Sequence, residues 1–210
     1  NLVGKALGLE VKEGLPVPSL VAPRPPKLCD GCPHVDSYTA LNEAMKSFPG
    51  GRVFSDIGCY TLGALPPFQA IYSTVDMGAS ITMAKGASEA DLLPSVAVIG
   101  DSTFTHSGMT GLLDCCVDNA NVTVIILDNG ITGMTGSQRS SATGRIESIC
   151  TGLGVDPAHI RVINPLKKYF EENVAIMKEE IAYKGVSVII PRRECIVALN
   201  KRLKAAKKAQ

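Results

Sequence analysis

Short apolar runs alternate with helix-length segments along most of the chain. The runs are rich in Val and Ile and are mostly continuous, and they cover 51–58, 69–75, 95–100, 122–129, 160–164 and 185–191. Continuous apolar strands of this length are typical of a parallel sheet that is buried on both faces. The intervening segments predict helices over 36–47, 78–90, 106–119, 165–183 and 193–208. The pattern therefore predicts an α/β fold: an open, mostly parallel sheet with helices on both faces.

Two of the predicted strands run into polar side chains at their carboxyl ends. Asp101 follows the run VAVIG, and Asn129 follows VIILD. Ligands of open α/β sheets bind beyond this edge, and carboxylate, amide and carbonyl oxygens suit Mg²⁺, which also takes phosphate oxygens. Each stretch alone is also what an ordinary turn looks like. Together, on neighbouring strands, they favour a metal site next to a phosphate group, where Gly100 would let the backbone approach the anion.

Composition limits the alternatives. The chain has 210 residues, of which 45% are hydrophobic and 20% charged, as in ordinary globular proteins. Five prolines fall in 12–27, so we expect residues 1–27 to form an extended arm on a neighbouring surface and residues 28–210 to form one domain. A net charge of +1 and 5% aromatic residues give no support to a nucleic-acid surface.

The same sequence predicts a cytoplasmic location without a membrane span. No apolar run approaches the ~20 residues that cross a bilayer, and the amino end lacks the continuous apolar block of a signal peptide. The chain also begins without methionine, which suggests a fragment or a processed product.

Seven cysteines, an odd number, argue against a closed set of disulfides. Cys29 and Cys32 form a C-x-x-C, which is compatible with iron or zinc ligation, with a redox pair or with chance. Cys59 follows another predicted strand end, and Cys195 follows the last strand. These four could also be small buried residues, as free cysteines often are. Core packing is our prediction for the remaining three, Cys115, Cys116 and Cys150.

Several motifs, in order, resemble one enzyme family. They are LCDGCPH (28–34), SDIGCYTLG (55–63), DMGASITMAKG (76–86), the GDS at 100–102 and DNGITGMTGSQ from residue 128. Over about 27–200 the chain is similar to the thiamine diphosphate-binding domain of 2-oxoacid:ferredoxin oxidoreductases, and most similar to the large (alpha) subunit of indolepyruvate:ferredoxin oxidoreductase. The resemblance implies a thiamine diphosphate-binding fold of the pyrophosphate type.

The resemblance also assigns roles to residues of this chain. It makes Asp101, Asn129 and the carbonyl of Ile131 the ligands of Mg²⁺. It places the thiamine diphosphate against Cys32, Gly58, Cys59, Met77, Gly78, Ser80, Gly100, Ser102, Thr132 and Gly133. It makes Cys29, Cys32, Cys59 and Cys195 the ligands of a [4Fe-4S] cluster, which needs four thiolates.

Two histidines are candidate catalytic residues. His34 lies inside the cysteine loop, where it could contact the cofactor or substrate or be an ordinary loop histidine. His106 follows GDSTFT, where it could face the diphosphate or be a polar residue of a first helical turn. No glutamate here resembles the one that activates thiamine, so the resemblance implies that another domain or subunit of an oligomeric assembly supplies it.

The implied reaction is the oxidative decarboxylation of a 2-oxoacid, such as the arylpyruvate indolepyruvate, to an acyl-coenzyme A, with electrons passing through iron and sulfur to ferredoxin. Two alternatives stay open. One is a non-oxidative, thiamine diphosphate-dependent 2-oxoacid decarboxylase subunit. The other is a non-catalytic scaffold with a vestigial fold.

Overall fold

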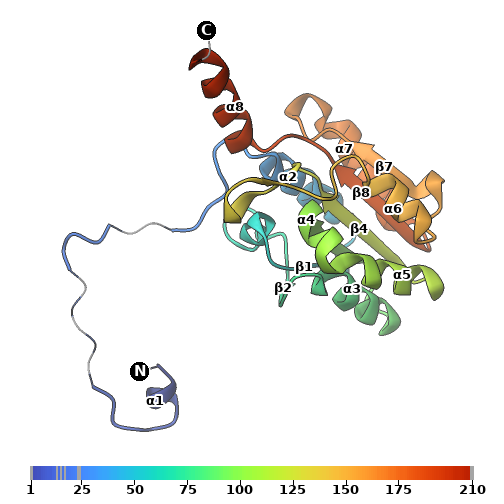
Figure 1. Ribbon diagram of the computed structural model, residues 1–210. Coiled ribbons are helices and arrows are strands. Elements are labelled where there is room, and N and C mark those ends of the chain that lie inside the picture. The colour runs from blue at the N-terminus through green and yellow to red at the C-terminus, as the bar shows by residue number, and fades with distance from the viewer. Residues whose placement is uncertain (1, 13, 15, 17, 23–24, 209–210) are drawn as a thin grey trace.

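The computed structural model describes residues 2–12, 14, 16, 18–22 and 25–208. Residues 1, 13, 15, 17 and 23–24 of the predicted arm lie outside the described residues. The described residues before Leu28 are not buried, and Figure 1 shows this part of the chain running away from the sheet, with a short helix, α1 (Leu2–Ala6), near its beginning. The placement of an arm on a neighbouring surface stays a prediction.

One six-stranded parallel sheet forms the centre of the molecule (Figure 1). Its order is β2-β1-β3-β4-β8-β7, and every pair is parallel. The strands are β1 (Arg52–Ser55), β2 (Ser73–Thr74), β3 (Ser95–Gly100), β4 (Val122–Leu127), β7 (Ile160–Ile163) and β8 (Val186–Pro191). All six predicted strands are present, although β2 is much shorter than its apolar run.

The helices of the domain are α2 (Pro33–Met45), α3 (Ala79–Glu89), α4 (Asp101–Thr103), α5 (Met109–Val117), α6 (Ile146–Gly152), α7 (Phe170–Ala182) and α8 (Ile196–Lys208). A turn of π-helix, η2 (Phe104–Gly108), joins α4 to α5. Short 3₁₀ turns are η1 (Cys59–Ala64), η3 (Gly133–Thr135), η4 (Pro157–His159) and η5 (Lys167–Tyr169). The predicted helix over 106–119 therefore begins earlier, at Asp101, and α6 was not predicted at all.

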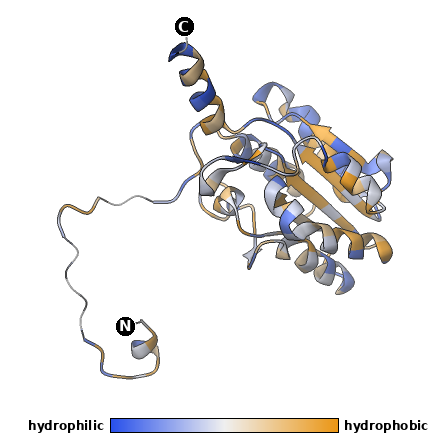
Figure 2. Cartoon of the chain, viewed as in Figure 1, coloured by the Kyte–Doolittle hydropathy of each residue, from blue (hydrophilic) through white to orange (hydrophobic). Residues whose placement is uncertain are grey.

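Successive side chains of each strand point to opposite faces, so the apolar strands fill two cores. Val96 and Val98 pack on one face with residues of α2 and α7. Ala97 and Ile99 pack on the other face with residues of α3, α5 and α6. Figure 2 shows apolar residues concentrated along these strands. The open parallel sheet with helices on both faces is confirmed.

Outside the sheet, β5 (Ile131–Thr132) pairs antiparallel with β6 (Gln138–Arg139). This small hairpin follows the carboxyl end of β4 and overhangs the edge where Asp101 and Asn129 lie. Within the described residues, no helix is long and apolar enough to cross a membrane.

Candidate cofactor site

Asp101 stands where β3 ends and α4 begins. β3 and β4 are neighbours in register, with Gly100 opposite Leu127, so both chains leave the sheet at the same edge. The Asp101 carboxylate is 2% exposed. It accepts hydrogen bonds from the main-chain N–H of Ser102 (2.8 Å) and of Gly130 (3.0 Å). Asp101 therefore links the end of β3 to the loop that follows β4.

The environment of Asp101 is unfavourable for an isolated negative charge. Burial raises the pKa of its carboxyl to about 6, and the neighbouring carboxylate of Asp128 adds to this effect. Hydrogen bonds from Ser102, Ser140 and Gly130 offset only part of the shift. Among the described residues, no ion pair of a Lys, Arg or His involves Asp101. A bound cation would supply the missing compensation.

Asn129, the second predicted ligand, is held from two sides. Its Oδ1 accepts from the main-chain N–H of Ile131 (3.0 Å), and its Nδ2 lies 3.3 Å from Nε2 of His34. His34 is buried in the first turn of α2, and burial lowers its pKa to about 4. The imidazole is therefore neutral at neutral pH, and its Nε2 accepts the amide proton of Asn129. This contact fixes which way the Asn129 amide points.

A cavity of about 280 Å³ opens at this edge of the sheet, between the carboxyl ends of β1, β3 and β4. Predicted site residues that line it are His34, Gly58, Cys59, Met77, Gly100, Asp101, Ser102, Asn129, Ile131, Thr132 and Gly133. Sequence reasoning missed the lining residues Ile57, Tyr60, Thr103, Leu127, Met134 and Thr135. All of these lie within three positions of a predicted residue, so the motifs located the walls but not their full extent.

Hydroxyl groups from two elements meet in the cavity wall. Ser102 Oγ and Thr132 Oγ1 are 2.9 Å apart, which joins α4 to β5. A Cβ atom on the next residue, Gly133, would lie 3.1 Å from Sγ of Cys59, so a glycine permits this close approach. The segment Thr132–Gly133 thus brings the hairpin against the start of η1.

Besides the cluster cysteines Cys29, Cys32 and Cys195, three predicted site residues lie outside the lining of this cavity. Gly78 precedes α3, and Ser80 is fully buried with its hydroxyl bonded to Asp56 rather than pointing into the cavity. His106 lies on the π-turn, exposed, with Nδ1 3.1 Å from the hydroxyl of its neighbour Ser107. A direct role of these three residues at the cofactor stays a prediction.

The four cysteines of the predicted cluster belong to chain segments that lie near one another in space. Burial, with smaller contributions from the nearby thiols of Cys29, Cys195 and Cys59, raises the pKa of the Cys32 thiol to about 11. The N–H of Cys195 also donates to the main-chain carbonyl of Asn129 (3.2 Å). Within the described part of the chain, however, no three or more His, Cys, Asp or Glu side chains are grouped to hold a metal ion. The iron–sulfur cluster therefore stays a prediction.

The other cysteines behave as expected. Cys115 and Cys150 are completely buried in the core between the sheet and α5 and α6, and Cys116 packs against that core. Burial raises the pKa of both Cys115 and Cys150 to about 12, so these thiols are neutral. Core packing is confirmed for all three.

The residues around Asp101 fit Mg²⁺ and a diphosphate. The buried carboxylate lacks a cationic partner among the described residues, the oriented amide of Asn129 presents an oxygen, and both are hard ligands of the kind that Mg²⁺ prefers. The hydroxyls of Ser102 and Thr132 and the start of α4 supply hydrogen-bond donors of the kind that bind phosphate oxygens.

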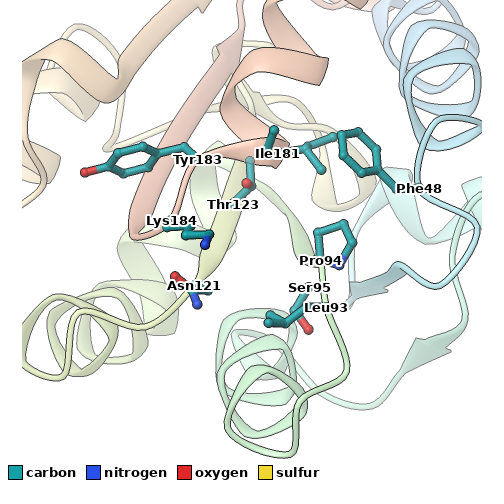
Figure 3. Close-up of a pocket in the computed structure, with 10 residues that line it drawn as sticks. Phe48, Leu93, Pro94, Ser95, Asn121, Thr123, Ile181, Tyr183 and Lys184 are labelled. Atoms are coloured by element: carbon teal, nitrogen blue, oxygen red, sulfur yellow. The ribbon is translucent and has the colours of Figure 1, made fainter.

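A second cavity, of about 310 Å³, lies at the opposite end of the sheet, among the amino ends of β3, β4 and β8 (Figure 3). Its walls are mainly apolar, with Phe48, Pro94 and Ile181 among them, and Lys184 is the one charged residue of its lining.

Comparison with known proteins identifies this architecture. The family described as "Thiamine pyrophosphate enzyme, C-terminal TPP binding domain" matches residues 56–190. Indolepyruvate oxidoreductase subunit IorA of Archaeoglobus fulgidus is 35% identical over 214 residues, covering 93% of this chain and 34% of that protein. The subunit of the same name from Thermococcus kodakarensis is 37% identical over 205 residues, covering 85% of this chain and 30% of that protein. The chain thus spans about a third of the length of these curated relatives.

Solved structures share the fold at lower sequence identity. A 2-oxoglutarate:ferredoxin oxidoreductase from Magnetococcus marinus superposes with a TM-score of 0.66 at 18% identity, covering 83% of this chain and 66% of that one. A benzoylformate decarboxylase from Polynucleobacter necessarius gives a TM-score of 0.54 at 14% identity, covering 75% and 33%. The family match begins directly after β1, ends within β8 and includes Asp101 and Asn129. The chain belongs to the thiamine pyrophosphate enzyme family and is a C-terminal TPP-binding domain.

Proposed function

We propose that this chain is the thiamine diphosphate- and Mg²⁺-binding part of a 2-oxoacid:ferredoxin oxidoreductase. The favoured substrate is an arylpyruvate such as indolepyruvate, because the curated relatives carry that name. The reaction is oxidative decarboxylation to an acyl-coenzyme A, with electrons passing through an iron–sulfur centre to ferredoxin. The protein acts in the cytoplasm within an oligomeric assembly.

One observation carries the proposal. The ends of two adjacent strands bring a buried carboxylate without a described cationic partner, Asp101, and an oriented amide, Asn129, to the floor of one cavity. In this arrangement Asp101, Asn129 and the carbonyl of Ile131 would hold Mg²⁺. Ser102, Thr132 and Gly133 would bind the diphosphate.

The residues of the chain bind and orient rather than perform the bond chemistry. Thiamine diphosphate, when bound, supplies the electron sink that allows a 2-oxoacid to lose carbon dioxide. His34 keeps the Asn129 amide in place. The apolar side chains of Ile57, Met77 and Met134 line the cavity and would limit the access of water to it once another surface of the assembly covers them.

The cysteines would provide the route for electrons. Cys29, Cys32, Cys59 and Cys195 would ligate a [4Fe-4S] cluster, and Cys59 also lines the cofactor cavity. The hydrogen bond from Cys195 N–H to the carbonyl of Asn129 ties the cluster segment to the metal-ligand segment. Burial raises the pKa of the Cys32 thiol. Iron bound by these four cysteines would favour the thiolate form of Cys32 in spite of this.

The test uses the complete assembly, purified without oxygen. We expect an absorbance band near 400 nm that bleaches on reduction, and 2-oxoacid-dependent reduction of ferredoxin that requires coenzyme A. Replacing Cys195 by serine should remove the band, whereas the same change at Cys150, a core cysteine, should keep it. Normal turnover without any band would overturn the oxidoreductase proposal.

A second candidate function is non-oxidative decarboxylation of a 2-oxoacid, because the fold is also similar to that of a benzoylformate decarboxylase. A non-oxidative decarboxylase would release an aldehyde, would not reduce ferredoxin and would leave all four cysteine thiols open to titration. A scaffold with a vestigial fold would differ from both, because thiamine diphosphate with Mg²⁺ would not raise the melting temperature of the assembly.

A further inference from the structure

Asp56 is a completely buried carboxylate that follows β1 and that the cofactor chemistry above does not use. It is 0% exposed and is not among the residues that line the cofactor cavity. A buried carboxylate is costly unless donors satisfy it, so its partners indicate what it does. These partners come from two separate segments of the cavity wall.

The first oxygen of Asp56, Oδ1, accepts the hydroxyl of Tyr60. The second, Oδ2, accepts three hydrogen bonds from the start of α3. These are the N–H of Gly78 (3.1 Å), the N–H of Ser80 (3.3 Å) and the hydroxyl of Ser80 (2.6 Å). The main-chain carbonyl of Asp56 also accepts the hydroxyl of Thr61 (2.6 Å). One residue thus joins η1 to the amino terminus of α3.

Both joined segments form the cavity. Ile57, Cys59 and Tyr60 line it from the β1 side, and Met77 lines it from the turn before α3. The turn lies directly against Ser107, because Gly78 has φ +95°, a Cβ there would lie 2.5 Å from the Ser107 hydroxyl, and that hydroxyl donates to the Met77 carbonyl (2.6 Å). Asp56 therefore sets how far apart the two walls stand.

Asp56 also reaches the metal-ligand strand through Tyr60. A Cβ on Gly100 would lie 2.5 Å from the Tyr60 ring, so the ring packs directly on the backbone that precedes Asp101. The Tyr60 carbonyl is in turn held by the hydroxyl of Tyr38 (2.6 Å). A displaced Tyr60 ring would leave Gly100, and with it Asp101, without this support.

We propose that Asp56 is a positioning residue of the cofactor site, which holds η1 and the start of α3 at the separation that thiamine diphosphate with Mg²⁺ requires. The carboxylate is needed because one oxygen receives three donors while the other receives the tyrosine hydroxyl. Burial raises the pKa of Asp56, and these donors, together with the positive end of the α3 dipole, favour its charged form. Asparagine has one acceptor oxygen and would turn an N–H₂ group toward one of these donors.

This inference rests on the proposed function, and its test uses the complete assembly. Thiamine diphosphate binding in the presence of Mg²⁺ is measured by calorimetry, and the melting temperature without cofactor is measured in parallel. Asp56→Asn should weaken binding about tenfold, as expected for the loss of charge-assisted hydrogen bonds that hold the site. Ser80→Ala should weaken it less, and the double variant should fall short of the sum of the two effects because both changes break the same contact.

Glu180→Gln is the matched control. Glu180 is also a buried carboxylate, 1% exposed, and it accepts from His159 and Arg161 away from the cofactor cavity. The variant Glu180→Gln should lower the melting temperature while leaving the affinity for the cofactor unchanged.

The inference is overturned if Asp56→Asn and Ser80→Ala bind thiamine diphosphate like the wild type, or if Glu180→Gln loses affinity equally. If Asp56→Asn does not assemble, Ser80→Ala decides alone. Failure of the wild type to bind thiamine diphosphate would instead overturn the proposed function.

Discussion

At the scale of single residues, His34 and Asn129 form the contact that orients a proposed Mg²⁺ ligand. The imidazole is buried and neutral, so it acts as a hydrogen-bond acceptor for the Asn129 amide. We expect His34→Leu to lower the Mg²⁺-dependent affinity for thiamine diphosphate about tenfold, because a buried N–H₂ group loses its partner and the amide is free to turn. A titration of Mg²⁺ against binding of the cofactor measures this.

His34→Gln is the informative companion variant. A glutamine carbonyl can accept from Asn129, so this variant should keep most of the Mg²⁺ affinity. If it keeps the affinity and loses turnover, then His34 also acts on the substrate, as the sequence allowed. If the Leu variant binds Mg²⁺ as tightly as the wild type, the contact with Asn129 has no orienting role.

Asp101 gives a second prediction at this scale. Its carboxylate is buried next to Asp128, and burial raises its pKa, so the charge opposes folding when no cation is bound. Asp101→Asn should therefore abolish Mg²⁺-dependent binding of the cofactor while leaving the melting temperature of the cofactor-free assembly equal to or above that of the wild type. Calorimetry and thermal unfolding would measure the two effects. A large fall in the melting temperature would mean that Asp101 mainly supports the fold.

The sequence located Asp101 and Asn129, the two proposed Mg²⁺ ligands at strand ends, because each follows a recognisable apolar run. It did not single out Asp56, whose partners Gly78 and Ser80 lie 22 and 24 positions further along the chain. A contact at that distance depends on how β1 and α3 pack, and spacing alone carries no signal of it. His106, by contrast, was singled out from a predicted helix start that the structure places elsewhere. The helical segment begins at Asp101, so His106 falls on the π-turn and is exposed.

At the scale of elements, the strands were predictable and the short pieces were not. Buried parallel strands need continuous apolar residues on both faces, and this requirement is visible in the sequence. The hairpin β5–β6 has two residues in each strand, and α6 has seven residues, fewer than the periodicity of either structure needs to be detected. These pieces are held by tertiary contacts instead.

One such contact anchors α6. Arg192, just after β8, donates to both oxygens of Glu147 on α6 (2.8 and 2.7 Å) and through Nε to Asp128 (2.6 Å). The Arg192 guanidinium lowers the pKa of Glu147 below its ordinary value. Because the folded pKa is lowered, this contribution to stability is present above about pH 4.5 and is lost as the pH falls through the folded value.

We therefore expect Glu147→Gln to lower the free energy of unfolding by less than about 1 kcal/mol at pH 7, since Glu147 is partly exposed and water screens the pair. As the pH falls below about 4.5 and through the lowered folded pKa of Glu147, the variant and the wild type should become equally stable, because the wild-type carboxyl is then protonated. Chemical denaturation at several pH values tests this. A difference that does not shrink as the pH falls would show that the ion pair is not its source.

At the scale of the whole molecule, the rim of the cofactor cavity is partly apolar and open. Ile57, Met77 and Met134 line the cavity, and Met134 is 70% exposed. Exposed apolar groups around a polar site are typical of a surface that another protein surface covers. None of the described residues that line the cavity is a glutamate. Under the proposed function, we expect the group that activates thiamine to come from that covering surface.

This arrangement predicts a separation between binding and activation of the cofactor. Residues 1–210 alone should bind thiamine diphosphate with Mg²⁺ through Asp101 and Asn129, but should not accelerate exchange of deuterium into the thiazolium carbon beyond the rate of the free cofactor. The complete assembly should accelerate this exchange, because a carboxylate from outside this chain then contacts the pyrimidine ring. Nuclear magnetic resonance of the quenched cofactor measures the exchange, and Asp101→Asn in the complete assembly controls for unbound cofactor. Rapid exchange by residues 1–210 alone would mean that the activating group lies within this chain, and the cavity would then have to be complete without a partner.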